Sequence, residues 1–196
     1  FRRSGSRFPL SPIHFWSQIE SAPSSSASAG YGPGAAPTGV DEGKGTHVAQ
    51  VKITMSEAER QEFLAGLHIG VVSINEPERG PLTVPVWYDY APGGDVSFIT
   101  PAESRKAALL SVGDRMSLCA QDEALPPKYV SVEGEVTEIR PATVEGDVTD
   151  MAVRYLGEEI GAIYVANSRE EDPREEIVVT FRPTRWFSAD FAKRLG

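Results

Sequence analysis

Cysteine is nearly absent from this sequence of 196 residues, in which Cys119 is the single example. One cysteine cannot form an intramolecular disulfide, so a disulfide framework is excluded and a reducing, cytoplasmic compartment is expected. Histidine is also scarce. His14, His47 and His68 lie too far apart for the spacing of a metal-ligating pair, and one cysteine cannot build a zinc site. We therefore expect no metal centre.

Long apolar runs are missing as well. No stretch approaches the roughly 18 residues of a membrane-spanning helix, and the first residues lack the continuous apolar region of a secretory signal. The sequence also lacks a G-x-S-x-G nucleophile elbow and a P-loop. If the protein is an enzyme, an organic cofactor should supply its reactivity.

Charge is unevenly distributed along the chain. Residues 1–54 carry five Lys and Arg against three Asp and Glu, whereas residues 55–196 carry fourteen against twenty-five. The second part has a net charge of −11 and would repel a polyanion, so nucleic acid is not an expected partner. A small anionic ligand held by a few local cations remains open.

The composition predicts a boundary near Met55. Residues 21–46 are mostly Ser, Ala, Gly and Pro, which is typical of a flexible linker. We interpret residues 1–54 as a disordered leader and linker: either a targeting or docking arm, or sequence read through from upstream of a start at Met55. The second alternative is favoured because Ser56 and Glu59 form the S-x-x-E pattern of a capping box directly after Met55. Residues 55–196 are then one domain.

Short strands separated by turn residues dominate this domain. Strands are predicted at 67–74, 81–90, 96–99, 115–121, 128–139 and 175–183, and helices at 101–110 and near 147–156. Strand 81–90 places Tyr88 on an apolar face with Leu82, Val84 and Val86, and Gly134 is expected to mark a bend or bulge. About six strands with two or three helices predict a mainly β fold, a small closed or half-open antiparallel barrel.

The stretch TPAESRKAALL, residues 100–110, has the features of a well-specified helix start. Thr100 suits the N-cap, Pro101 the first helical position and Glu103 the third, which forms a second capping box. Ser104, Arg105 and Lys106 add a hydroxyl and two cations to the first turns. They could form a phosphate cradle at the helix start, or a solvated, charged helix face. The spacing alone does not decide between the two.

The order of short motifs resembles a known superfamily. PVWYDY, VSFIT, SRKAALL, RMSLCAQ, KYVSVEGEV and PTRW follow one another as in the pyridoxamine 5′-phosphate oxidase-like split barrels, and they resemble the flavin- and deazaflavin-dependent oxidoreductase branch in particular. The similarity spans roughly residues 57–191. It implies a homodimer of six-stranded, FMN-binding-type split barrels, with two cofactor sites at the subunit interface.

The resemblance also implies which residues bind the cofactor. Ser104, Arg105 and Lys106, with Thr100 at the end of the preceding strand, correspond to the segment that binds the cofactor phosphate. Lys128 and Tyr129, at the start of the long strand, correspond to positions that reach toward the phosphate or the partner's site. Lys128 could equally be a solvated lysine at a strand end.

The same resemblance assigns contacts to the tricyclic ring of the cofactor. Pro85, Val86 and Trp87 correspond to the strand that lies along the ring, and Trp186 to an aromatic residue near it. Because Trp87 and Tyr88 point to opposite faces of their strand, Trp87 is the better ring contact. Trp186 could also anchor the core or the dimer.

The chemistry expected from the resemblance is two-electron transfer. We expect hydride transfer from deazaflavin coenzyme F420 to a small, electron-poor organic substrate, with FMN as the alternative cofactor. F420 is favoured because SRKAALL lacks the lysine of the oxidase's R-x-x-x-L-K phosphate motif. A non-catalytic protein that binds a flavin, a tetrapyrrole or a fatty acid is the other alternative. Catalytic residues stay unassigned, with Tyr88, Tyr129 and a water as candidate proton donors.

Overall fold

The computed structural model describes residues 53–171 and 174–195. The proposed linker, and all but the last two residues of the proposed leader, lie outside the described residues. The strands are β1 (Gly70–Ile74), β2 (Leu82–Val86), β3 (Tyr88–Tyr90), β4 (Val96–Pro101), β5 (Arg115–Asp122), β6 (Lys128–Pro141) and β7 (Glu176–Asp190). The helical segments are α2 (Glu57–Ala65), α3 (Arg105–Ala108), η1 (Val144–Val148), α4 (Thr149–Leu156), α5 (Glu158–Glu171) and η2 (Phe191–Arg194).

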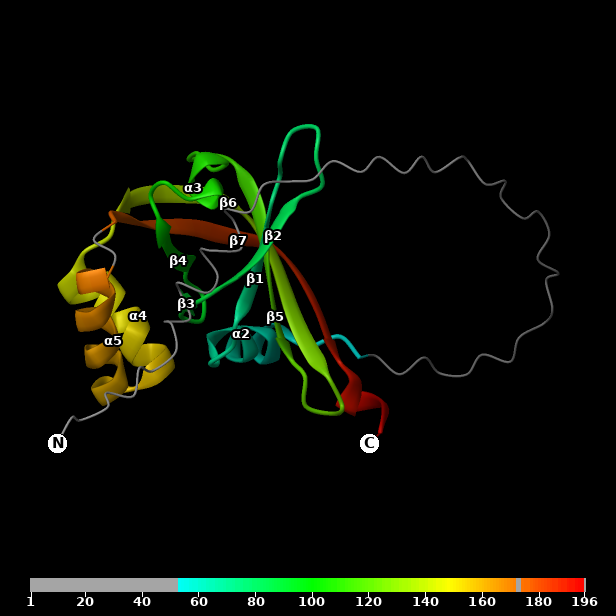
Figure 1. Ribbon diagram of the computed structural model, residues 1–196. Coiled ribbons are helices and arrows are strands. Elements are labelled where there is room, and N and C mark those ends of the chain that lie inside the picture. Colours follow the sequence, from blue (N-terminus) through cyan, green and yellow to red (C-terminus); the bar gives the residue numbers. More distant parts are fainter. Residues whose placement is uncertain (1–52, 172–173, 196) are drawn as a thin grey trace, which may run out of the picture.

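The seven strands form one antiparallel sheet in the order β2-β1-β5-β6-β7-β4-β3. Its edge strands, β2 and β3, are separated in sequence by Trp87 alone, so the sheet must curl until its two edges approach each other at that residue (Figure 1). The predicted mainly β, half-open barrel is confirmed. The described residues form seven strands rather than six, because the segment predicted as one strand at 81–90 is interrupted at Trp87.

A side chain from α4 occupies this interruption. The backbone N–H of Tyr88 donates to the Tyr155 hydroxyl at 3.0 Å, and this hydroxyl donates to the carbonyl oxygen of His68 at 2.7 Å. The rings of Trp87 and Tyr155 are stacked, with centroids 4.9 Å apart and planes at 5°. Tyr155 therefore supplies hydrogen bonds that a continuous strand would have made. It also holds α4 and α5 against the interruption at Trp87, between β2 and β3.

Tyr155→Phe is expected to destabilise the domain by about 1–2 kcal/mol, because it leaves the Tyr88 N–H and the His68 carbonyl without their partner while it keeps the ring stacking. Urea unfolding of the full chain would measure the change. Tyr129→Phe removes the same hydroxyl at an exposed position and is the matched control. Equal losses of stability in the two variants would contradict this role of Tyr155.

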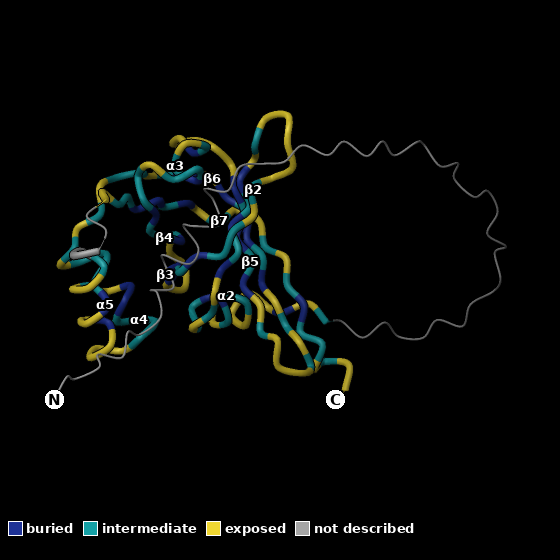
Figure 2. The backbone as a smooth tube through the Cα atoms, viewed as in Figure 1, coloured by how far each residue is buried: buried dark blue, intermediate teal, exposed yellow. Residues whose placement is uncertain are grey.

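The core lies inside the curled sheet and beneath α2, where buried residues alternate along the strands (Figure 2). Tyr88 is fully buried, and its hydroxyl donates to the Leu64 carbonyl of α2 at 2.8 Å. Val86 is buried on the same face and the half-buried Val84 packs against the core, so the predicted apolar face is confirmed for Val84, Val86 and Tyr88, whereas Leu82 is only half-buried. The predicted irregularity at Gly134 is also confirmed, because the β6–β7 register shifts between Glu133 and Gly134.

The first capping box is present as predicted. The Ser56 N–H donates to Glu59 Oε2 at 2.6 Å, and the Glu59 N–H donates to Ser56 Oγ at 3.3 Å. Lys193 donates to the same carboxylate at 2.8 Å. The hydrogen bonds from Lys193 and Ser56 lower the pKa of Glu59 to about 2, so the cap keeps its charge through the mildly acidic range.

The second capping box, predicted at Thr100–Glu103, is wrong. Thr100 and Pro101 continue β4 and pair with Ile177 and Glu176 of β7, so they are strand residues. The helix predicted at 101–110 is reduced to the single turn of α3, and its N-cap is Ser104. Strand pairing with a distant segment has overridden the local helix signal.

Three helical segments, η1, α4 and α5, follow β6 in the described part of the chain, where one helical stretch was predicted. The helical stretch expected near 147–156 corresponds to α4, whereas α5 has no counterpart in the sequence prediction. Gly157, at φ 79°, separates the two helices. In Figure 1 the pair lies beside β3 and β4, on the opposite side from the β5–β6 connection and the end of β7. Within the described part of the chain, every helix falls short of the length and apolarity that a membrane crossing requires.

Candidate cofactor site

The predicted phosphate-binding segment begins where β4 ends. Ser104 Oγ accepts the Ala107 N–H at 3.2 Å, which caps α3, and shares a hydrogen bond with Thr100 Oγ1 at 3.0 Å. Thr100 is buried, with 1% of its surface exposed. Thr100 therefore positions the Ser104 hydroxyl and is not itself accessible to a ligand in this conformation.

The two cations of this segment point to different environments. Arg105 forms an ion pair with Glu76 of the β1–β2 loop, and about a third of its side chain is exposed. Lys106 is buried, with 6% of its surface exposed. Because α3 has four residues, its backbone dipole is small, and the anion-binding capacity of the segment rests on Arg105 and Ser104 rather than on a helix terminus.

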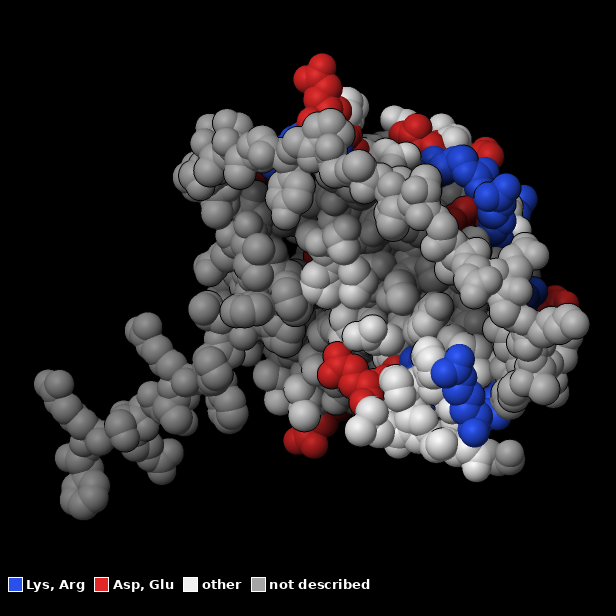
Figure 3. Space-filling model, turned by 90° about the vertical axis from the view of Figure 1, so that its right-hand side faces the viewer, with Lys and Arg blue, Asp and Glu red and all other residues white. Residues whose placement is uncertain are grey.

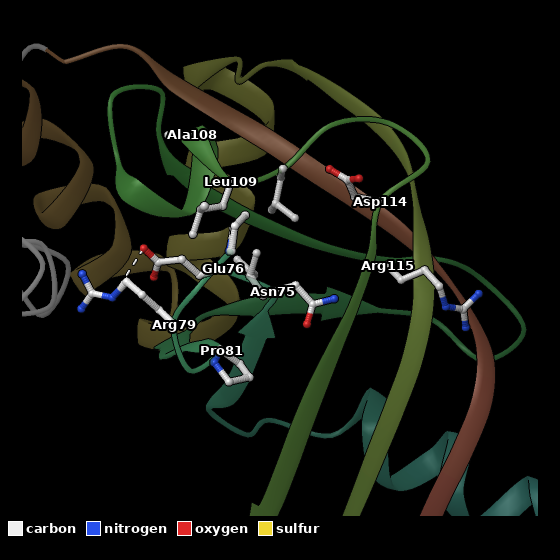
Figure 4. Close-up of a pocket in the computed structure, with 11 residues that line it drawn as sticks. Asn75, Glu76, Arg79, Pro81, Ala108, Leu109, Asp114 and Arg115 are labelled. Carbon is white, nitrogen blue, oxygen red and sulfur yellow. Dashed lines mark ion pairs between the residues drawn. The ribbon is translucent and has the colours of Figure 1, made fainter. Parts of the chain in front are cut away.

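A pocket of about 590 Å³ lies beside this segment (Figure 4). Its walls come from the end of β1, the β1–β2 loop, the end of α3 and the start of β5. They consist of Ile74, Asn75, Glu76, Pro77, Arg79, Pro81, Ala108, Leu109, Leu110, Asp114 and Arg115. In Figure 4, Glu76 and Arg79 face each other on one side, and Asp114 and Arg115 lie on the other. The volume is in the range of small-molecule sites.

The strand predicted to lie along the cofactor ring is divided between core and surface. Val86 is buried in the core, and Pro85 is half-buried and pairs with Val71. Trp87 is half-buried and packs on Tyr155 and on Tyr164 of α5, whose ring centroid is 5.5 Å away. One face of Trp87 is thus occupied by its own chain, so a ring contact would have to use the rest of the indole.

Two of the remaining predicted residues, Lys128 and Trp186, lie near α2. Lys128 Nζ lies 5.8 Å from the ring centroid of Phe63. Trp186 meets the Tyr90 ring edge-on at 6.0 Å, and the Arg60 guanidinium lies 5.0 Å from the Trp186 ring centroid. Tyr129 follows Lys128 with 38% of its surface exposed. In this chain Trp186 packs against the core cluster, the alternative that the sequence left open.

The residues predicted to contact or reach toward the cofactor phosphate fall into two separate groups. Thr100 pairs with Ile177, which pairs with Pro141 at the end of β6, whereas Lys128 begins β6 and pairs with Asp190. Fourteen strand residues at about 3.3 Å each place the two ends roughly 40 Å apart along the strand. One chain therefore does not bring Lys128 and Tyr129 to Arg105.

Several residues around the site were not found from the sequence. Glu76 and Arg79 lie in NEPERG, which signals only a turn, and their relation to Arg105 depends on the folded β1–β2 loop. Arg154 of α4 donates to the Ala65 carbonyl at 2.8 Å and lies 3.4 Å from Asp89. No local pattern in the sequence marks either set.

The candidate proton donors differ in accessibility. The Tyr88 hydroxyl is fully buried, and its burial raises its pKa above the ordinary range, so it stays protonated and bonded to the Leu64 carbonyl.

Burial also raises the pKa of the Cys119 thiol and lowers the pKa of His68, whose ring stacks on that of Phe63 with centroids 4.2 Å apart. Among the residues that the structure describes, no group of three or more His, Cys, Asp and Glu side chains could hold a metal ion.

Described side chains of both charge signs lie on one face of the molecule. On the face shown in Figure 3, the described Lys and Arg side chains form separate groups with Asp and Glu nearby, rather than one continuous basic area. An anionic ligand must therefore compete with carboxylates for its cationic contacts.

Comparison with solved structures identifies the fold. A conserved hypothetical protein from Mycobacterium tuberculosis has a TM-score of 0.58 and 25% sequence identity, over 74% of this chain and 90% of that chain. A structure named F420 reductase has a TM-score of 0.52 and 19% identity, over 65% of this chain and 94% of that chain. Among curated proteins, none matches the sequence.

These similarities agree with the half-open barrel. The family model described as pyridoxamine 5′-phosphate oxidase matches residues 56–188, which is more than half of the chain, and the protein therefore belongs to the pyridoxamine 5′-phosphate oxidase-like family of split-barrel proteins.

Proposed function

We propose that this protein is an oxidoreductase that uses the deazaflavin coenzyme F420 in the reduction of a small, electron-poor organic substrate. The family supports oxidoreductase chemistry in general. F420 is supported by the lack of a lysine after the leucines of SRKAALL, and the fold is shared with a structure named F420 reductase.

The observation that carries this proposal is the position of Arg105 beside a pocket of ligand size. Arg105 contacts Glu76, a pocket-lining residue, and a guanidinium has further N–H donors in a planar fork that suits phosphate. The hydroxyl of Ser104, the residue before Arg105, lies at the N-cap of α3. These groups fit an anionic cofactor tail, provided that the Glu76 carboxylate moves aside or shares Arg105.

Each part of the chain has a separate task in this proposal. When bound, a deazaflavin supplies two-electron hydride chemistry. Arg105 and Ser104 would hold its anionic tail, and the strand around Pro85 and Trp87 would orient its ring and exclude water. Tyr129, whose surface is partly exposed, is a better placed proton donor than the buried Tyr88.

A homodimer is part of the proposal. Lys128 and Tyr129 lie at the opposite end of β6 from Arg105, so a second copy of the chain is needed to bring them to the same cofactor. Gel filtration of the full chain would test this, because a monomer would leave each proposed pocket without its second half.

Cofactor binding by the purified full chain tests the proposed function directly. We expect a colourless protein that quenches the fluorescence of added F420 and binds it at micromolar concentration. A yellow protein with the visible absorbance of an oxidised flavin would instead assign FMN. If neither F420 nor FMN binds at micromolar concentration, the oxidoreductase proposal is wrong.

A further inference from the structure

Glu76 is a carboxylate placed between two arginines. It lies in the β1–β2 loop, and 13% of its side chain is exposed. It pairs with Arg105 of α3 and lies 3.8 Å from Arg79 of its own loop. Both Glu76 and Arg79 line the pocket of about 590 Å³, where Figure 4 shows their side chains turned toward each other. A largely enclosed carboxylate thus neutralises cations at the wall of a cavity.

Carboxylate and phosphate oxygens are interchangeable partners for a guanidinium, since both accept its paired N–H groups in the same planar geometry. Glu76 therefore stands where an anionic group of a ligand would contact Arg105. If Glu76 withdrew, Arg79 and Arg105 would be left with a cavity beside them and without their common counter-ion, which favours occupation by another anion.

The loop that carries Glu76 lies at the surface. Asn75 and residues 77–81 are exposed, so few contacts besides the ion pairs hold the loop. Glu78 has φ 61°, in the left-handed region that residues other than glycine seldom adopt. Withdrawal of Glu76 from Arg105 would therefore require movement of a surface loop and not of the core.

We propose that Glu76 is an exchangeable internal anion: it holds Arg105 and Arg79 in the ligand-free protein, and the phosphate of a bound ligand takes its place. This inference deepens the proposed function, on which it rests for the nature of the ligand. It makes Glu76 a specificity-determining residue, because a ligand must offer Arg105 a stronger contact than the carboxylate does. If Glu76 instead orients Arg105 for the ligand, replacing Glu76 by Gln should weaken phosphate binding.

The test is the affinity of the full chain for inorganic phosphate, measured by calorimetry. Glu76→Gln keeps the size of the side chain and removes the competing charge, so we expect phosphate to bind about three- to tenfold more tightly than to the wild type. Glu78→Gln removes the same charge from the same loop, where Glu78 is exposed, and should leave the affinity nearly unchanged. In an Arg105→Ala background, Glu76→Gln should lose most of its effect.

Unchanged or weaker phosphate binding by Glu76→Gln, or no phosphate binding by either form, would overturn the exchange. An equal gain in Glu78→Gln would overturn it as well, because the effect would then be general electrostatics. F420 and FMN titrations of the same variants separate this inference from the proposed function. If Glu76→Gln binds phosphate more tightly but no form binds F420 or FMN, the exchange at Glu76 is supported and the oxidoreductase proposal is wrong. If F420 binds but Glu76→Gln does not bind phosphate more tightly, the oxidoreductase proposal stands and the exchange is wrong.

Discussion

Gly134→Ala is expected to destabilise the domain by about 3 kcal/mol, or to prevent its folding, because the new methyl group has no space. A Cβ on Gly134 would lie well inside van der Waals contact of the Arg182 carbonyl oxygen and 2.8 Å from Cδ2 of Phe181. Phe181 is fully buried, and β7 is hydrogen-bonded on both sides, to β6 and β4. Neither the ring nor the backbone can move aside at low cost.

The control for this prediction is Gly80→Ala in the β1–β2 loop, where a Cβ would meet no atom within 4 Å. That substitution should change the free energy of unfolding by less than about 0.5 kcal/mol or raise it slightly. Thermal unfolding and urea titration of both variants would measure the difference. A Gly134→Ala protein as stable as the wild type would show that the β6–β7 bulge has space for a methyl group at position 134.

Gly134 also illustrates what could be predicted from the sequence. The alternation of Val130, Val132 and Val136 sets the buried face of the long strand, and a glycine on that face is by itself a signal for the bulge that the β6–β7 register contains. The capping box at Ser56 and Glu59 is equally local, because its hydrogen bonds join residues three apart. Features with a signal in the local sequence were therefore predicted correctly, although Arg182 and Phe181 of β7 complete the bulge at Gly134.

Features that have no local signal in the sequence, or a misleading one, were not predicted correctly. The sequence from Thr100 to Glu103 satisfies every local rule for a helix start, yet pairing with Ile177 and Glu176 extends β4 through Pro101. The interruption at Trp87 depends in the same way on the Tyr155 hydroxyl, which belongs to a helix much later in the chain. Local signals were overridden wherever such tertiary hydrogen bonds supplied better partners.

The candidate site contains residues that were predicted from the sequence and a residue that was not. Ser104, Arg105 and Thr100 were expected together and lie together, since they are close in sequence. The partner of Arg105 was missed because Glu76 is brought to it by the β1–β2 loop, and an acidic residue in a turn has no distinguishing pattern. Sequence analysis thus identified the cation of the site and not the carboxylate that competes for it.

Arg105→Ala is expected to weaken F420 binding by about 2–3 kcal/mol, which corresponds to a roughly 30- to 150-fold higher Kd, because charge-assisted contacts to an anionic group are lost. Fluorescence quenching of F420 would measure the Kd. Arg79→Ala is the matched control, since it removes a cation that contacts the same Glu76 from a more exposed position. Its effect should be several times smaller.

Part of the Arg105→Ala effect should come from Glu76 itself, which would keep its negative charge at the cavity wall after losing its main partner. Because the exchange at Glu76 requires Arg105, the double variant Arg105→Ala with Glu76→Gln should bind F420 only slightly more tightly than Arg105→Ala alone, and more weakly than the wild type. Circular dichroism and thermal unfolding should show all of these variants folded, because neither side chain belongs to the core cluster. If Arg105→Ala binds F420 as tightly as the wild type does, the anionic tail is held elsewhere, and the assignment of residues 104–106 as its cradle is wrong.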